Sequence, residues 1–461
     1  MSFLNLIRKH LVVFLTLAFL SFSYFTHGWQ NWLGLSPQEE IAAIILVITA
    51  TLWISESIPL YITSLGVLFL SILWLLPALE GAGMEADKND FLIAFFGDIT
   101  LLFMGGFVLA ALLNKYGISQ MLAQNILRRT GSSSQRILFS IILVSAFLSM
   151  WISNTGTAAM MFAIMAPVIM ELPDSNPFAK GIALAIPFAC NIGGIGTPIG
   201  TPPNAIAMEY ITRTGIEVTF FNWMLIAIPL MLILLFLLWK ILLRIYPPTE
   251  KEVYLTIEAD QDFGSDQYLV VSIFFLTVIG WLTSGLTGIS TGSVGLFVVL
   301  AAFGTRLLET QDFKNISWDI LFMLGGGLCL GVALQKSGFT NTIADLVPTQ
   351  GSYLLLLLVL LVLSAIMTTF MSNTATANLL IPVAVSLPNG ELILSVAIAL
   401  MCSTSMALPI STPPNAIAFG SGLLQSKDMI SSGLILTGLA LIGILLACIF
   451  YLPIILYNLT Q

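Results

Sequence analysis

Two short polar motifs each occur twice in this chain. The sequence SNTGTA at Ser153–Ala158 returns as SNTATA at Ser372–Ala377, and PIGTPPNAIA at Pro198–Ala207 returns as PISTPPNAIA at Pro409–Ala418. The second motif is identical at nine of its ten positions, and both pairs keep the same order. Hydroxyl and amide groups can donate hydrogen bonds to a carboxylate or offer oxygen to a cation. Duplicated polar motifs in an apolar chain therefore predict a binding site between two repeats.

The Ser-Asn-Thr motif is expected at the tip of a helical hairpin, where two half-helices meet. The second half-helix presents its N-terminus to the tip, and its free backbone N–H groups and positive dipole end favour an anion. Serine, asparagine and threonine are also good N-caps, so a plain capping role is the alternative. The presence of the motif at two tips favours the binding role.

The Thr-Pro-Pro-Asn motif must interrupt a helix. Two successive prolines remove two backbone donors and disfavour helix at the preceding residue. The break frees backbone carbonyls around Gly200 and Ser411, which are natural ligands for sodium, whereas Thr201 and Thr412 offer hydroxyls to a substrate. The alternative is a proline kink that serves only helix packing.

The candidate site contains no arginine, lysine, aspartate or glutamate. A bound dianion would then need half-helix N-termini and co-bound cations to offset its charge, which favours coupling to sodium. Proton coupling has weaker support, since its candidate carriers are Glu56, Asp98, Glu209 and Asp319. Asp98 and Asp319 are better explained as N-caps of the helices that they begin.

The composition places these motifs in a polytopic membrane protein. Hydrophobic residues make up 57% of the chain and charged residues 9%, with a mean hydropathy of +0.99, whereas soluble domains carry about 25% charged residues. The only histidines are His10 and His27, and the four cysteines are scattered through apolar runs. We expect no metal centre of histidine or cysteine ligands and no enzymatic nucleophile–base pair.

The expected fold is an all-α membrane protein with about eleven transmembrane helices and two re-entrant helical hairpins. Each hairpin combines two apolar stretches of about 15 residues, too short to cross a hydrocarbon core of roughly 30 Å. The hairpins are expected at 136–170 and 352–386. The spans are expected at 11–27, 39–57, 59–77, 91–114, 178–210, 219–245, 267–284, 290–308, 318–336, 391–422 and 430–457, of which 178–210 and 391–422 are broken helices.

The distribution of positive charge predicts an orientation. With the N-terminus in the cytoplasm, thirteen lysines and arginines fall on the cytoplasmic side, and only Lys88, Arg213 and Lys336 fall outside. This places the C-terminus outside and the two hairpins on opposite sides of the inner (plasma) membrane.

The two halves are expected to be inverted repeats. Asp98, Gly105-Gly106 and Lys115 match Asp319, Gly326-Gly327 and Lys336 in spacing. The predicted organisation is an N-terminal end with a retained first helix and outer loop, a first repeat, an acidic cytoplasmic linker and a second repeat, at 1–38, 39–248, 249–266 and 267–461.

At these motifs the chain resembles the divalent anion/sodium symporter family. The paired Ser-Asn-Thr and paired Thr-Pro-Pro-Asn motifs are typical of that family, and Trp53–Pro59 is similar to its early W-x-x-E-x-I/L-P pattern. The resemblance covers nearly the whole chain. It implies a homodimer with a scaffold part and a mobile transport part that shifts like an elevator.

The resemblance also implies roles for individual residues. A first sodium ion would bind Ser149, Ser153, Asn154 and the backbone near Gly200, and a second would bind Thr368, Asn373 and the backbone near Ser411. The substrate would be a C4-dicarboxylate such as succinate, fumarate or malate. It would contact Asn154, Thr155, Thr201, Asn373, Thr374, Thr412 and Pro413.

Other functions stay open at this stage. The same architecture could carry sulfate or citrate, or could couple to protons or exchange anions. An anion channel is a less favoured class, because two cation-capable motifs suit alternating access better. A channel would conduct without sodium dependence, which separates the two.

Overall fold

The computed structural model describes residues 11–173, 176–253, 263–346, 352–387, 390 and 392–459. The predicted cytoplasmic N-terminal end (1–10), half of the predicted linker (254–262) and the last two residues lie outside this description. Within the described residues the fold is helical, and extended pairing is limited to an isolated bridge between Ser133 and Glu252.

The first half of the chain runs from α2 to α14. Its helices are α2 (Leu11–Phe25), α3 (Gly28–Leu33), α4 (Pro37–Ser55), α5 (Leu60–Leu70), η1 (Ser71–Leu75), α6 (Leu76–Gly81), α7 (Lys88–Phe95), α8 (Asp98–Lys115), α9 (Ile118–Arg128), α10 (Ser134–Ser149), α11 (Asn154–Glu171), α12 (Pro177–Gly194), α13 (Pro202–Arg213) and α14 (Phe220–Ile245).

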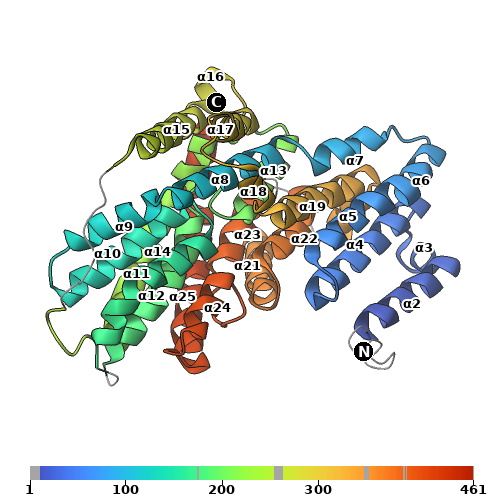
Figure 1. The fold of residues 1–461 in the computed structure, drawn as a ribbon. Helices are drawn as coiled ribbons and strands as arrows, with labels where there is room; N and C mark the ends of the chain where they lie inside the picture. Colours follow the sequence, from blue (N-terminus) through green and yellow to red (C-terminus); the bar gives the residue numbers. More distant parts are fainter. Residues whose placement is uncertain are drawn as a thin grey trace, which may run out of the picture.

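The second half runs from α15 to α26. Its helices are α15 (Ser265–Leu282), α16 (Ser284–Thr287), α17 (Thr291–Gly304), α18 (Thr310–Lys314), α19 (Trp318–Lys336), α20 (Phe339–Leu346), α21 (Tyr353–Phe370), α22 (Asn373–Ser386), α23 (Ile393–Thr404), α24 (Pro413–Gly420), α25 (Ser426–Leu446), η2 (Ala447–Tyr451) and α26 (Leu452–Leu459). Figure 1 shows α2–α6 at one end of the molecule, α9–α12 at the other, and α21–α24 between them.

Among the described residues, eight helical segments are long and apolar enough to cross a membrane. Three expected spans are not among them: α2 has 15 residues, and the two broken helices divide into α12 and α13, of 18 and 12 residues, and α23 and α24, of 12 and 8. The segment 290–308 is also short, since α17 has 14 residues. The eight segments are Pro37–Ser55, Leu60–Gly81, Lys88–Lys115, Phe220–Ile245, Ser265–Leu282, Trp318–Lys336, Tyr353–Phe370 and Ser426–Ile455.

The helix α21 differs from its predicted length. Its 18 uninterrupted residues make it one of the eight membrane-length helices, whereas a half-helix of about 15 was expected. No proline or glycine interrupts Tyr353–Phe370, so the helix continues until the Ser372 cap. The re-entrant path of the α21–α22 pair remains a prediction.

Both Thr-Pro-Pro-Asn motifs break their helices, as predicted. The helix α12 ends at Gly194 and α13 begins at Pro202, while α23 ends at Thr404 and α24 begins at Pro413. Thr201 and Thr412 have extended backbones and act as N-caps. The prolines occupy the first helical turn, where a missing N–H costs nothing, so the motif starts a helix as well as ending one.

The helices with paired glycines each pack on a helix of the other half. The helix α8 contacts α17, and a Cβ atom added at Gly105 would clash with the backbone of Gly295. The helix α19 contacts α5, and a Cβ atom at Gly326 would clash with Ser64. These close approaches require glycine. Each pair joins a helix of one half to a helix of the other half, and this arrangement is the crossed packing of the two halves.

Two ion pairs repeat this crossed arrangement at the surface. Lys115, at the end of α8, lies 2.7 Å from the carboxylate of Asp312. Lys336, at the end of α19, lies 3.0 Å from the carboxylate of Asp90. Each lysine therefore reaches into the other half, where it contacts the third residue of a short helix.

Neither of the two aspartates expected to cap their own helices is the N-cap residue of its helix. The N-cap of α8 is Gly97, and the Asp98 carboxylate instead accepts hydrogen bonds from Ser290 Oγ at 2.6 Å and Gly292 N at 3.0 Å. Asp98 thus binds the N-terminus of α17. Asp319 is the second residue of α19, after the N-cap Ser317, so the prediction that it caps this helix is wrong.

Candidate functional site

The first hairpin tip gathers oxygen atoms around Asn154. Ser149 Oγ lies 2.5 Å from Asn154 Oδ1 and 2.9 Å from the backbone oxygen of Cys190. With its amide turned over, Asn154 donates to Cys190 O and Gly200 O, each at 3.3 Å. Four groups from α10, α11, α12 and the first break thus surround one point, and three of them are the predicted Ser149, Asn154 and Gly200.

The second tip repeats the contacts of the hydroxyl with the asparagine and with the cysteine carbonyl, but Asn373 has no contact corresponding to that of Asn154 with Gly200 O among the described residues. Thr368 Oγ1 donates to Asn373 Oδ1 at 2.7 Å and to Cys402 O at 2.9 Å. The hydroxyl stands five residues before the asparagine in both repeats, and each hydroxyl also contacts the carbonyl of a cysteine on the broken helix. Both hydroxyl residues, Ser149 and Thr368, are fully buried. The sequence repeat is therefore also a repeat of geometry.

The asparagines of the two Thr-Pro-Pro-Asn motifs donate hydrogen bonds to backbone carbonyls of the broken segments that precede them. Asn204 Nδ2 donates to Gly194 O at 3.0 Å and to Thr197 O at 2.7 Å. Asn415 Nδ2 donates to Met406 O at 3.1 Å and to Leu408 O at 3.0 Å. Some of the carbonyls that the break frees are therefore satisfied internally.

The role of Asn204 and Asn415 was missed in the sequence. Their identical place in both motifs was the signal that could have shown it.

The two repeats meet through their buried polar side chains. Asn191 Nδ2, from α12, donates to Thr412 Oγ1 at 3.1 Å and approaches Asn415 Oδ1 at 3.3 Å. In the other direction, Ser403 Oγ, from α23, lies 3.4 Å from Thr201 Oγ1. Asn191 and Ser403 occur at corresponding points of the two repeats, just after the paired cysteines. Neither was singled out from sequence, since neither belongs to the repeated motifs.

The contacts of Thr412 determine where its proton can point. Its oxygen accepts from Asn191 Nδ2 and from the backbone N–H of Asn415 at 3.3 Å. A hydroxyl oxygen has two lone pairs and one proton. With both lone pairs in use, the Thr412 hydroxyl is left to donate to a further acceptor, which a carboxylate would provide.

The remaining predicted residues differ in their surroundings. Ser153 accepts from Gly156 N at 3.2 Å and Ser372 accepts from Ala375 N at 3.1 Å, so each tip serine caps its helix. Ser411 Oγ donates to Leu408 O at 2.7 Å within its own break. Thr374 is buried, whereas Thr155 and Pro413 are exposed.

Four helices begin at these motifs. They are α11, α13, α22 and α24, with 18, 12, 14 and 8 residues. Each helix N-terminus carries partial positive charge and free N–H groups, which favour an anion. Among the described residues no three His, Cys, Asp or Glu side chains gather as a metal site. The site thus combines backbone dipoles, hydroxyls and amides.

A family profile described as Citrate transporter matches residues 50–404, which is more than half of the chain. The chain belongs to this transporter family. The sodium-dependent dicarboxylate transporter SdcS of Staphylococcus saprophyticus is 31% identical, over 91% of this chain and 87% of that protein. An uncharacterized transporter of Haemophilus influenzae is 32% identical, over 88% of this chain and 90% of its own.

These relatives confirm the resemblance to sodium-coupled divalent-anion symporters, and membership of the family confirms a transporter rather than an enzyme. Two solved structures share the fold. The YdaH transporter of Alcanivorax borkumensis has a TM-score of 0.55 and 13% identity, over 79% of this chain and 87% of that one. MtrF of Neisseria gonorrhoeae has a TM-score of 0.52 and 10% identity, over 78% and 82%. They support the all-helical, multi-pass membrane fold.

Proposed function

We propose that this protein is a secondary-active, sodium-coupled symporter that imports C4-dicarboxylates such as succinate, fumarate and malate. The observation that carries the proposal is the pair of matching polar clusters at Asn154 and Asn373, in a chain whose relative is named a sodium-dependent dicarboxylate transporter. Helix N-termini and hydroxyls attract a dianion, but the site has no cationic side chain. Co-transported sodium supplies the missing positive charge.

The first cluster is the better-defined sodium site. When Asn154 Oδ1 faces Ser149 Oγ, Cys190 O and Gly200 O, four oxygens converge with no proton donor other than the serine hydroxyl. A cation makes that orientation favourable. Half-helix ends and unwound carbonyls are where transporters hold sodium. Ser153 would complete this site.

The second sodium ion would bind Thr368, Asn373 and the backbone near Ser411. The substrate carboxylates would contact hydroxyl and amide groups between the two clusters. Those groups belong to Asn154, Thr155, Thr201, Asn373, Thr374 and Thr412, with Pro413 beside them.

The crossed packing supports an elevator-type alternating-access mechanism. The paired-glycine helices α8 and α19, with α17 and α5, would form the scaffold, and the hairpins and broken helices would move against it. We further propose a homodimer in the inner (plasma) membrane, with a cytoplasmic N-terminus and an outer C-terminus. The count of positive charges supports this orientation.

Uptake of labelled succinate into proteoliposomes tests the proposal. Uptake should require an inward sodium gradient and should persist when a proton gradient is collapsed. Sodium-independent uptake would point to proton coupling or exchange, and conductance without sodium would point to a channel. The absence of uptake for every dicarboxylate would refute the proposal.

Citrate is the second candidate substrate, because the matching family profile is described as Citrate transporter. Competition by citrate, sulfate and succinate against labelled succinate, in the same vesicles, ranks the three anions. The proposal expects succinate to compete best.

The site assignment has its own test. Asn154→Ala and Asn373→Ala each remove the amide at the centre of a cluster, so each should abolish sodium-driven uptake while the purified protein keeps its melting temperature within a few degrees. Normal uptake in either variant would show that the asparagine lies outside the site.

A further inference from the structure

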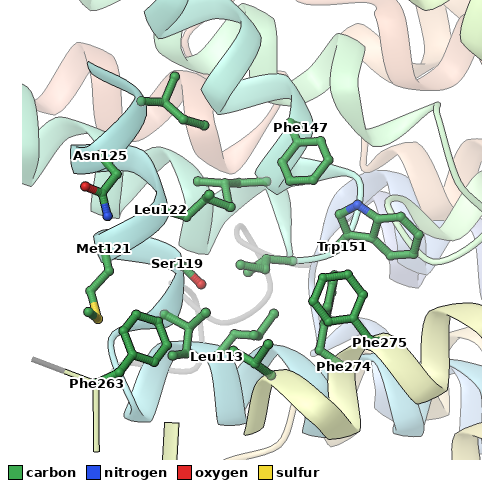
Figure 2. Close-up of a pocket in the computed structure, with 15 residues that line it drawn as sticks. Leu113, Ser119, Met121, Leu122, Asn125, Phe147, Trp151, Phe263, Phe274 and Phe275 are labelled. Carbon is green, nitrogen blue, oxygen red and sulfur yellow. The ribbon is translucent and has the colours of Figure 1, made fainter. Parts of the chain in front are cut away.

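A cavity of about 510 Å³ lies beside the first hairpin tip, apart from the polar clusters. Figure 2 shows side chains of α9 on one side of the cavity. Phe147 of α10 and Trp151, just after α10, face them from the opposite side, and Phe274 and Phe275 of α15 close a third side. A volume of this size is typical of ligand sites. None of the fifteen residues that line it carries a charge.

Two buried polar groups in this lining lack partners. The indole Nε1 of Trp151 and the hydroxyl of Ser119 are buried and find no hydrogen-bond partner among the described residues. Trp151 is 8% exposed and Ser119 is 2% exposed. A buried polar group without a partner costs about 1–3 kcal/mol. Two such groups on one cavity indicate that an occupant with a hydrogen-bond acceptor belongs there.

The Trp151 ring is held in place, so its N–H is not free to turn toward another acceptor. The ring stacks on Phe220 at 6.3 Å between centroids and meets Phe274 edge-on at 5.7 Å. Figure 2 shows the nitrogen edge of the indole on the cavity side. The donor direction is therefore fixed by packing.

Water does not suit this cavity. A buried water needs two to four polar partners, and a volume of about 510 Å³ would hold many waters around three polar side chains, those of Ser119, Asn125 and Trp151. The rim is apolar as well, since Leu122, Phe147 and Phe275 are 38%, 45% and 58% exposed. Such a rim is favourable where it meets hydrocarbon and unfavourable where it meets water.

We propose that this cavity binds an acyl chain of a membrane lipid, with its ester carbonyl accepting a hydrogen bond from Trp151 Nε1. An ester suits the site better than a fatty-acid carboxylate, because an ionised group in an uncharged, apolar cavity has no partner for its charge. The occupant lies against the tip residue Trp151, two positions before Ser153. This second site is separate from the proposed substrate site.

Photo-crosslinking of the full chain tests the assignment. The protein is reconstituted in phospholipid vesicles that contain a phosphatidylcholine with a diazirine on one acyl chain, irradiated, digested and mapped by mass spectrometry. Adducts are expected on the α9 and α10 peptides that contain Ser119 and Trp151. Labelling is measured without transport, so its result is independent of the proposed function.

Two variants and a control sharpen the test. Leu122→Trp puts a larger side chain into the space that the acyl chain would occupy, so adducts should fall roughly tenfold. Trp151→Phe keeps an aromatic ring but removes the donor, so adducts should fall about fivefold for a lost hydrogen bond of about 1 kcal/mol. Leu286→Trp, at a residue 89% exposed and outside the cavity, should label like the parent protein. Each variant is used only if it melts cooperatively.

Competition identifies the chemical source. Methyl palmitate should reduce labelling of the cavity peptides more than ionised palmitate does. Stronger competition by palmitate would overturn the ester assignment. Equal labelling of the parent protein and both variants, no adduct on these peptides, or crosslinks from them to a second copy of the chain would each overturn the lipid site.

Discussion

Replacement of Asn191 by leucine should damage the proposed substrate site while leaving the fold intact. Asn191 is buried and donates to Thr412 Oγ1 at 3.1 Å and to Asn415 Oδ1 at 3.3 Å. The variant leaves two buried acceptors without that donor. Asn415 keeps its position, because its own amide nitrogen still donates to Met406 O and Leu408 O. The main loss therefore falls on the orientation of the Thr412 hydroxyl.

The magnitude follows from the cost of unpaired buried groups. That cost is about 1–3 kcal/mol, and each 1.4 kcal/mol is tenfold in an equilibrium constant, so the KM for succinate should rise roughly 5- to 150-fold. The maximal rate should change less, since Asn191 positions Thr412 rather than contacting the substrate. Initial rates of sodium-driven uptake at several succinate concentrations give both quantities.

The other repeat supplies the matched controls. Serine stands at the corresponding position, where Ser403 Oγ lies 3.4 Å from Thr201 Oγ1. Asn191→Ser should therefore recover part of the lost affinity, and Ser403→Ala should have a smaller effect because its contact is longer. An unchanged KM in Asn191→Leu, or a KM in Asn191→Ser as poor as in the leucine variant, would refute the reasoning.

Two further predictions concern the crossed packing of the halves. Lys115→Glu should lower stability by up to about 1 kcal/mol, since the pair with Asp312 is at the surface, and adding Asp312→Lys should restore the melting temperature. The hydrogen bond from Lys115 lowers the pKa of Asp312 below its ordinary value. The stabilisation of the fold by this pair is therefore complete above about pH 4 and is lost as the pH falls further. The melting temperatures of Lys115→Ala and the parent protein should then converge at low pH, and a difference that grows at low pH would contradict this pH dependence. Gly105→Ala should lower the stability of the fold by about 1–3 kcal/mol, because the new methyl group pushes α8 off Gly295. Gly438→Ala is the control: no atom lies near its new methyl group, so it should be neutral or stabilising by up to about 1 kcal/mol. Equal melting temperatures for the two alanine variants would count against the close packing.

Local chemistry explains what the sequence could predict. Two prolines break a helix whatever surrounds them, so both breaks were placed correctly. The hydroxyl–asparagine spacing at Ser149–Asn154 and Thr368–Asn373 lies within one tip, and both contacts form.

Long-range contacts explain what it could not. The partners of Asn191 and Ser403 lie more than two hundred residues away, so nothing local marks these residues. Asp98 was misassigned for the same reason, because the helix that it binds begins in the other half of the chain. The length of α21 was underestimated because its apolar stretch was taken as about 15 residues, although no proline or glycine ends the helix within Tyr353–Phe370.

The crossed pairing of glycine helices has a consequence for biosynthesis. The contact face of α8 at Gly105 has its partner at Gly295, and Gly326 of α19 has its partner at Ser64. When the first half leaves the ribosome, the faces of α8 at Gly105 and of α5 at Ser64 have no partner until the second half follows. Contacts over such long separations are slow to form. These two faces stay uncovered in the bilayer until the second half arrives, and separately produced halves should be stable only when made together.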